Sequence, residues 1–255
     1  MNKDFCFVTL SNEPYLDRAH QTIQELRING KYDGEIVVII GDDLKDRIDY
    51  DDDKVTIKYF PNIDRTDSLT KISNTRISDG REFTKTFQWQ KTYCFHEYFK
   101  KWDKCCFIDA GMRIIKPVNK IINLDCENKL LAHSDSYPTY ERTLSCQFDS
   151  LYFSELFDEL KKNYDMDIDY FQSTIMLYDT NIIEENTFET LIELSNKYYN
   201  TKTNEQAIFN LYFTCYKKVW EQLKIKDEET YYYDFFERDS QTYKNYIMLK
   251  YPKTL

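Results

Sequence analysis

Apolar residues along the chain fall into short runs that are typical of strands, separated by longer stretches with helical spacing. Residues 5–10, 35–40 and 55–60 are the first three predicted strands. The run at 35–40 is β-branched and continuous, as in a parallel strand that is buried on both faces. Between the first two runs, residues 14–27 carry a helical pattern that opens with proline in its first turn.

The same alternation continues through the rest of the chain. Further strands are predicted at residues 104–109, 130–131 and 170–178, with an extended segment at 114–118. Helices are predicted at residues 83–99, 150–163, 184–199 and 204–223. The polar segment 61–81 is predicted to be a long loop, and residues 243–255 form an aromatic and basic tail. With no internal repeat or linker, the pattern predicts one α/β domain over residues 1–255, an α/β/α sandwich around a mostly parallel central sheet.

Composition and charge narrow the range of functions that a protein with this predicted fold could have. Hydrophobic residues make up 42% and charged residues 31% of the chain, values of an ordinary soluble protein. No apolar run reaches the length of a membrane span and the start does not resemble a secretory signal, so we expect a cytoplasmic protein without a membrane span. The formal net charge of −10 disfavours nucleic-acid partners, and binding of phosphate would need local basic residues.

Several common chemistries lack their sequence signatures. The turn after the first predicted strand contains no glycine, which argues against a dinucleotide or methyl-donor site, and no P-loop follows any strand. The seven cysteines form no CxxC pair, so neither a disulfide framework nor a zinc site is indicated. The three histidines are scattered along the chain, and no serine or cysteine nucleophile has a local signature.

The most informative segment is 102–111, an apolar run that ends in Asp109, Ala110 and Gly111. Open α/β sheets bind ligands beyond the carboxyl ends of their strands, and a small residue beside the carboxylate lets a diphosphate approach closely. This placement indicates a functional Asp109. An aspartate that caps a turn is the alternative, and position alone does not separate the two.

In this region the chain resembles glycogenin and its relatives. Residues 83–89, the strand beginning at 104 and the sequence Ile108, Asp109, Ala110 follow that family's order and spacing. The resemblance implies the nucleotide-diphospho-sugar transferase fold of GT-A type, and transfer of a hexose from a UDP sugar with retention of configuration. The family's strand ends in Asp, Ala, Asp and binds a manganese ion, which makes Asp109 the implied metal ligand. Gly111 replaces the second carboxylate and no histidine follows His133, so this sequence lacks two of the family's metal ligands.

The resemblance also implies residues that contact the donor. Thr9, Leu10, Ser11, Asn12 and Tyr15 resemble the family's first strand and loop, which hold the uracil ring.

The basic residues Arg81, Lys85, Lys250 and Lys253 resemble groups near the donor phosphates, with Arg76 as an alternative to Arg81. A fixed cation could neutralise a leaving diphosphate. A solvated surface charge is the alternative for the two arginines and for the two lysines of the tail.

Four residues are the implied catalytic candidates: Asp135, Gln172, Glu205 and Gln206. Asp135 resembles the family's aspartate near the transferred sugar, and Gln172 replaces an amide that contacts the sugar, beside Thr174 in place of glycine. Glu205 and Gln206 replace an Asp, Gln pair, where a carboxylate can orient a hydroxyl or stabilise positive charge at the anomeric carbon. A short polar loop around Asp135, and a capping box at Glu205, are the structural alternatives.

Two functions of different class follow. The chain is either a glycosyltransferase that uses a nucleotide sugar and an unidentified carbohydrate or protein acceptor, or a non-catalytic nucleotide-sugar-binding protein on the same fold. Residues 137–169 resemble an insertion relative to the family, and residues 137–146 are the predicted acceptor region. The sequence does not predict the oligomeric state.

Overall fold

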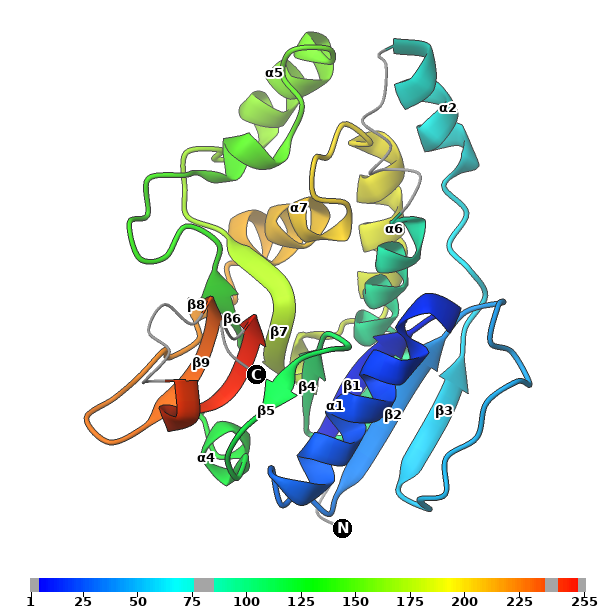
Figure 1. Cartoon of the computed structure of the whole chain (residues 1–255). Helices are drawn as coiled ribbons and strands as arrows, with labels where there is room; N and C mark the ends of the chain where they lie inside the picture. The colour runs from blue at the N-terminus through cyan, green and yellow to red at the C-terminus, as the bar shows by residue number, and fades with distance from the viewer. Residues whose placement is uncertain (1–4, 76–84, 237–242, 252–255) are drawn as a thin grey trace.

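A seven-stranded sheet forms the centre of the protein, whose computed structural model describes residues 5–75, 85–236 and 243–251. Its strands lie in the order β3-β2-β1-β4-β7-β6-β8 (Figure 1). Their bounds are β1 (Phe5–Ser11), β2 (Glu35–Ile40), β3 (Val55–Tyr59), β4 (Lys104–Ile108), β6 (Leu130–Ser134), β7 (Phe171–Asp179) and β8 (Trp220–Gln222). Only β7 runs against its neighbours, so the predicted mostly parallel α/β sheet is confirmed.

A second, three-stranded sheet packs against the first. It consists of β5 (Arg113–Ile114), β10 (Tyr246–Tyr251) and β9 (Tyr231–Phe236), with β10 in the middle. Its register pairs Leu249 with Arg113, close to the end of β4 along the chain. The small sheet thus places β10, which contains Lys250, close to Asp109.

Helices cover both faces of the large sheet. The α-helices are α1 (Leu16–Ile28), α2 (Thr66–Thr75), α4 (Asn119–Ile122), α5 (Ser154–Asn163), α6 (Thr187–Lys197) and α7 (Glu205–Phe209), the last continued by the π-helical η6 (Asn210–Tyr216). The 3₁₀ helices are η1 (Glu13–Tyr15), η2 (Thr86–Phe95), η3 (Glu97–Lys101), η4 (Leu144–Gln147), η5 (Thr180–Ile182) and η7 (Tyr243–Asn245). No helix among these is long and apolar enough to cross a membrane, within the described part of the chain.

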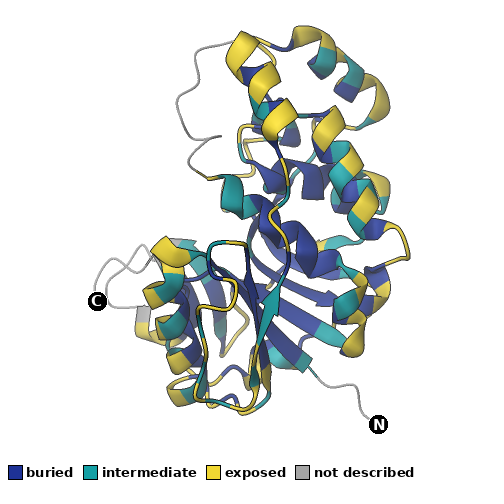
Figure 2. Ribbon diagram, turned by 90° about the vertical axis from the view of Figure 1, so that its right-hand side faces the viewer, coloured by how far each residue is buried: buried dark blue, intermediate teal, exposed yellow. Residues whose placement is uncertain are grey.

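Strand alternation divides the interior into two cores. Because successive side chains of a strand point to opposite faces, Phe7 of β1 packs with Ile23 and Leu26 of α1, whereas Val8 packs with Phe95 of η2 on the other side. The two layers of buried residues are visible in Figure 2. This division is the α/β/α sandwich that the sequence predicts.

The predicted long loop at 61–81 is wrong for its described part, which contains α2. Asp64 caps the helix by accepting a hydrogen bond from the backbone N–H of Thr66 at 2.9 Å, and Ser68 and Ile72, four residues apart, are buried. A narrow buried stripe in a polar helix leaves little periodicity to detect.

The predicted helix at 204–223 is also wrong at its carboxyl end. Lys218 has a left-handed backbone with φ of 55°, which ends the helical segment, and the chain then forms β8. The pairing of Trp220 with Leu130 of β6 supplies the hydrogen bonds that a helix would have made. Such pairing joins residues far apart in sequence and has no local signal.

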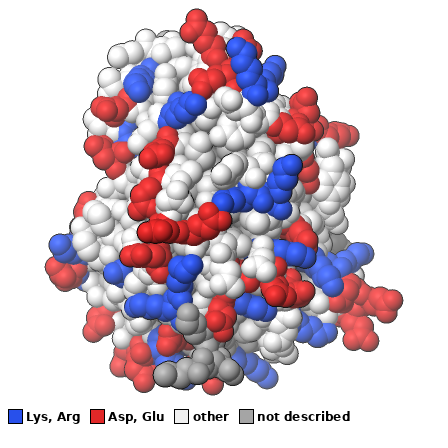
Figure 3. All heavy atoms as spheres, turned by 180° about the vertical axis from the view of Figure 1, so that it is seen from behind, with Lys and Arg blue, Asp and Glu red and all other residues white. Residues whose placement is uncertain are grey.

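Charges of both signs are interspersed over the face seen in Figure 3. No large area of one sign stands out on this face, although the chain carries a formal net charge of −10. On this face, strong attraction for an anion would therefore need a smaller, local group of cations.

Asn210, the first residue of η6, fixes the start of β7. Its fully buried amide accepts a hydrogen bond from the N–H of Phe171 and donates one to the carbonyl of the same residue, both at 2.9 Å. We expect Asn210→Leu to lower the free energy of unfolding by about 2–4 kcal/mol, because two buried backbone groups lose their partners. Urea denaturation measures the loss. The exposed control Asn163→Leu should change stability by less than about 0.5 kcal/mol, and an equal loss in both variants would contradict this role.

Candidate functional site

The ends of four strands meet at one edge of the large sheet. β1, β4 and β6 run in the same direction and end there, while β7 runs the opposite way and begins there. A cavity of about 570 Å³ opens at this edge. It lies where open α/β sheets bind their ligands, beyond the carboxyl ends of the parallel strands.

Most of the donor-binding residues predicted from the sequence line this cavity. They are Leu10, Asn12, Tyr15, Lys85, Asp109, Ala110 and Lys250. Thr9 and Ser11 are buried in β1 and are not among the lining residues. Arg76, Arg81 and Lys253 lie outside the described residues.

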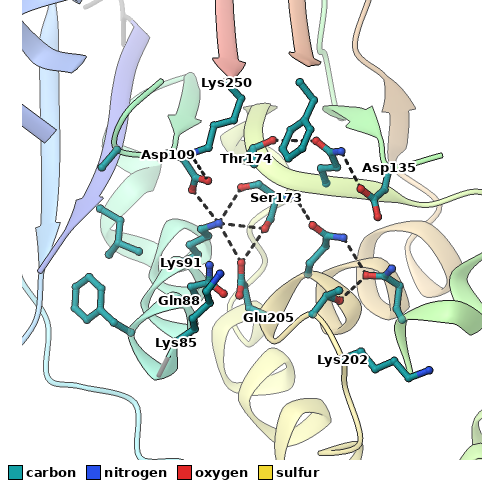
Figure 4. A pocket seen from close by; sticks show the side chains of 18 of the residues that line it. Lys85, Gln88, Lys91, Asp109, Asp135, Ser173, Thr174, Lys202, Glu205 and Lys250 are labelled. Atoms are coloured by element: carbon teal, nitrogen blue, oxygen red, sulfur yellow. Dashed lines mark hydrogen bonds and ion pairs between the residues drawn. The ribbon is translucent and has the colours of Figure 1, made fainter. Parts of the chain in front are cut away.

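The four predicted catalytic residues also line the cavity, namely Asp135, Gln172, Glu205 and Gln206. They come from the end of β6, the start of β7 and the start of α7. The structure therefore brings the donor-side residues and the catalytic candidates to one place, as Figure 4 shows for several of them.

Lys91 of η2 lies at the centre of the site (Figure 4). Its Nζ is 2.9 Å from Asp109 Oδ1 and 3.2 Å from Glu205 Oε1. It also donates hydrogen bonds to the Oγ of Ser173 at 3.2 Å and to the carbonyl of Ser173 at 3.3 Å. One ammonium group thus connects η2 with the end of β4, the start of β7 and α7.

Because Lys91 is buried, its charge needs the two nearby carboxylates as partners. Only 5% of its side chain is exposed, and removal from water acts to lower the pKa of a lysine. The nearby carboxylates of Asp109 and Glu205 outweigh that effect and hold the pKa of Lys91 above its ordinary value. The lysine is therefore charged at every physiological pH.

Asp109 carries a second ammonium group. Lys250 of β10 lies 3.0 Å from its Oδ2, so each carboxylate oxygen faces one lysine. Burial acts to raise the pKa of Asp109, but Lys250 and Lys91 outweigh it and hold the pKa below its ordinary value. The carboxylate remains ionised, and its charge is balanced inside the cavity.

Amide groups line the part of the cavity next to Lys91 and Lys250. Gln172 donates to Asp135 Oδ1 at 2.8 Å, and Gln206 accepts a hydrogen bond from the backbone N–H of Ser173 at 3.2 Å. The Gln206 amide also donates to Gln147 at 3.0 Å. Amides and carboxylates placed side by side can both donate to and accept from sugar hydroxyls.

One of the two carboxylate oxygens of Glu205 lacks a hydrogen-bond partner among the described residues. Its Oε1 accepts hydrogen bonds from Lys91 and from Ser173 Oγ, the latter at 2.8 Å. Its Oε2 is buried and has no hydrogen-bond partner among the described residues. Since a buried carboxylate oxygen without a partner is costly, a donor group of a ligand in the cavity would stabilise it.

Further residues line the cavity that the sequence did not predict, among them Lys91, Arg18, Gln88 and Lys202, whereas Arg142 lies in the predicted acceptor region 137–146. Lys91 had a detectable signal, because it is a lone charge within the aromatic helical pattern of residues 87–95. Arg18 and Lys202 are single charged residues in polar surroundings, and Gln88 is an uncharged residue between Phe87 and Trp89. Nothing in their local sequence separates them from ordinary surface residues.

The implied manganese ion does not fit the residues present. Among the described residues, no group of three or more His, Cys, Asp and Glu side chains could hold a metal ion. Ala110 and Gly111 offer no side-chain ligand, and both oxygens of Asp109 are paired with ammonium groups. Manganese prefers several oxygen ligands with negative charge, and here two cations already occupy the only carboxylate that the sequence places at this strand end.

Solved glycosyltransferases share this fold. The galactosyltransferase LgtC, in complex with donor and acceptor sugar analogs, aligns over 96% of this chain and 86% of its own, with 10% identity and a TM-score of 0.62. The core-mannan synthase CmsA/Ktr4 of Aspergillus fumigatus, in its Mn/GDP form, aligns over 89% and 75%, with 11% identity and a TM-score of 0.54.

The glycosyltransferase GlyE of Streptococcus pneumoniae aligns over 87% of this chain with 13% identity and a TM-score of 0.54, but over only 45% of its own, so this chain spans a little under half of GlyE. No protein-family model matches the chain, and no curated protein matches its sequence. At these identities the likeness defines the fold, which is that of the GT-A glycosyltransferases.

The central position of Lys91 leads to a prediction about stability and pH. We expect Lys91→Met to lower the free energy of unfolding by roughly 3–5 kcal/mol near neutral pH, because it leaves a buried carboxylate without its cation. The loss should shrink as the pH falls from about 7 to about 5, since a buried carboxylate without a cation binds a proton more readily in the folded state than in the unfolded chain.

The unaltered protein should show the opposite slope in acid. The lowered pKa of Asp109 contributes stability above the unfolded pKa, and this contribution is lost as the pH falls through the folded pKa. Denaturation of both proteins from about pH 7 down to about pH 3 measures the two slopes. Lys129→Met, which removes an exposed partner of Glu221, is the control. Parallel slopes for Lys91→Met and the unaltered protein would contradict the assignment.

Proposed function

We propose that this protein transfers a hexose from a nucleotide sugar, most simply a UDP sugar, to a hydroxyl of an acceptor with retention of anomeric configuration. The bond between the anomeric carbon and the diphosphate oxygen breaks, and its electron pair leaves with the nucleoside diphosphate. The acceptor oxygen forms the new bond to the anomeric carbon. The proton of the acceptor hydroxyl passes to the leaving diphosphate.

The observation that carries this proposal is the charge of the cavity. Six cationic side chains line it against three carboxylates, in a chain with a formal net charge of −10. A surplus of positive charge at one concave site of an acidic protein favours an anionic ligand there. A diphosphate meets this requirement, and it would lie beside the small residue Ala110 at the end of β4.

The part of the cavity next to the cations suits a sugar. Gln172, Asp135 and Gln206 offer donors and acceptors, and the Oε2 of Glu205 can accept a hydrogen bond from a hydroxyl. In the transition state the anomeric carbon gains positive charge, which a nearby ionised carboxylate stabilises. We assign this electrostatic role to Glu205 and the orientation of the sugar to the amides.

The opposite end of the cavity suits a nucleobase. Leu10 and Tyr15 supply apolar surface, and the Oδ1 of Asn12 is buried without a hydrogen-bond partner among the described residues. An acceptor atom in this position would be satisfied by the N–H of a pyrimidine or purine. This end therefore supports a nucleotide donor over a simple sugar phosphate.

A non-catalytic nucleotide-sugar-binding protein is the second candidate function. Gly111 at the end of β4 favours it, because the resemblance places a metal-binding carboxylate at that position. Calorimetry combined with a donor turnover assay separates the two functions. Binding of a UDP sugar without release of UDP, in the presence of candidate acceptors, would favour the binding protein.

The transferase proposal predicts slow release of nucleoside diphosphate from one member of a panel of UDP, GDP and ADP sugars. We expect Glu205→Gln to lower kcat/KM for that donor by about 10²–10³-fold, because the ionised carboxylate acts on charge that develops in the transition state. Its Kd for the nucleoside diphosphate should change by less than about tenfold, since the carboxylate is proposed to act on the sugar and reaches the diphosphate only through Lys91. The isosteric control Glu221→Gln, at an exposed ion pair, should change neither quantity.

A further inference from the structure

We propose that Lys91 and Lys250 together take the place of a divalent cation, so that this site binds and releases a nucleoside diphosphate without metal. This inference rests on the proposed function and adds to it the chemical identity of the group that neutralises the diphosphate. It departs from what the resemblance to the glycogenin family implies, because that family uses a metal ion at the same strand end.

The geometry places two fixed cations where the strand motif would hold a metal. The two Nζ atoms lie 2.9 Å and 3.0 Å from the two oxygens of Asp109, one on each. Both lysines line the cavity, and in Figure 4 they approach the carboxylate from opposite sides, Lys91 from η2 and Lys250 from β10. Their combined charge equals that of one divalent ion.

Charge repulsion works against a metal at this position. A divalent cation bound to Asp109 would lie within a few ångströms of two ammonium groups, of which Lys91 is almost completely removed from solvent. Screening by water is weak at such a site, so the repulsion remains strong. Lys91 cannot leave easily, because Glu205 and Ser173 also bind it.

The same lysines are suited to the chemical step. When the bond between the sugar and the distal phosphate breaks, the electron pair stays on the diphosphate and its negative charge increases. Lys91 and Lys250 stabilise that charge from fixed positions, as a metal ion would. In the absence of a donor, Asp109 partly neutralises both ammonium groups and so competes with the diphosphate for them.

The first test measures binding of UDP and of GDP by calorimetry, in metal-free buffer with chelator and again with manganese chloride. We expect the Kd of the preferred diphosphate to agree within about twofold between the two conditions, because the cations belong to the protein. A Kd at least about tenfold lower with manganese would overturn this inference and leave the proposed function standing. Absence of binding by both diphosphates in both conditions would instead overturn the proposed function.

The second test uses Asp109→Asn. Binding through a metal ion and binding through the two lysines predict different changes in the affinity of this variant for the diphosphate. Loss of a metal-binding carboxylate would abolish manganese-assisted binding. If the lysines bind the diphosphate, removal of a competing negative charge leaves affinity unchanged or raises it up to about tenfold. Thermal denaturation confirms that the variant is folded, and Asp227→Asn, at an exposed turn, is the matched control. A loss of affinity of more than about tenfold in folded Asp109→Asn would overturn the inference.

The third test separates the diphosphate from the nucleoside. In Lys250→Met we expect the Kd for UDP to rise by about tenfold or more, while the Kd for uridine, which has no phosphate, stays the same. Lys129→Met, whose lysine lies at an exposed pair outside the cavity, should change neither constant. An equal loss for uridine and UDP in Lys250→Met would indicate a structural role and would overturn the inference.

Discussion

The ammonium group of Lys91 must be neutralised wherever it lies in the interior, and the site is arranged around this requirement. Asp109 comes from the end of a central strand, Ser173 from the start of its antiparallel neighbour, and Glu205 from a helix more than 100 residues later than Lys91. Without the lysine, these segments would bring two carboxylates together in a region with little solvent. One buried cation therefore fixes the relative positions of the groups that line the cavity.

This arrangement also explains how an acidic chain can carry a positive cavity. Asp109 and Glu205 are already paired with lysines, whereas Arg18 and Lys85 add positive charge to the lining of the same cavity. The long-range field of the whole protein and the short-range field of the site thus have opposite signs. The cavity lining therefore suits a ligand that carries negative charge at one end and hydroxyl groups at the other.

Local sequence was enough to predict the layers and the strand end that carries Asp109, because β-branched runs and the helix of residues 14–27 have clear periodicity. It was enough, through the resemblance, to predict that Gln172, Glu205 and Gln206 would share one site. It was not enough for contacts that depend on distant partners. The edge strand at Trp220–Gln222 exists through its pairing with β6, and the role of Lys91 depends on carboxylates from two other segments.

The same limit applies to the metal. The resemblance implies that Gly111 replaces a carboxylate, but only the fold shows that both oxygens of Asp109 face lysines. The tail lysine Lys250 could have been a solvated charge, as the sequence allowed. Its position in the middle strand of the small sheet decides the question.

The contact between Lys250 and Asp109 spans 141 positions of the chain. During synthesis from the amino end, the aspartate and the strand that carries it are therefore complete long before this lysine leaves the ribosome. Until then Asp109 and Glu205 share Lys91 as their only cation among these four residues, which leaves the nascent site with one negative charge in excess. Among these four residues the charges balance only when β10 lies between β5 and β9, so each oxygen of Asp109 has its own cation only after the small sheet has formed.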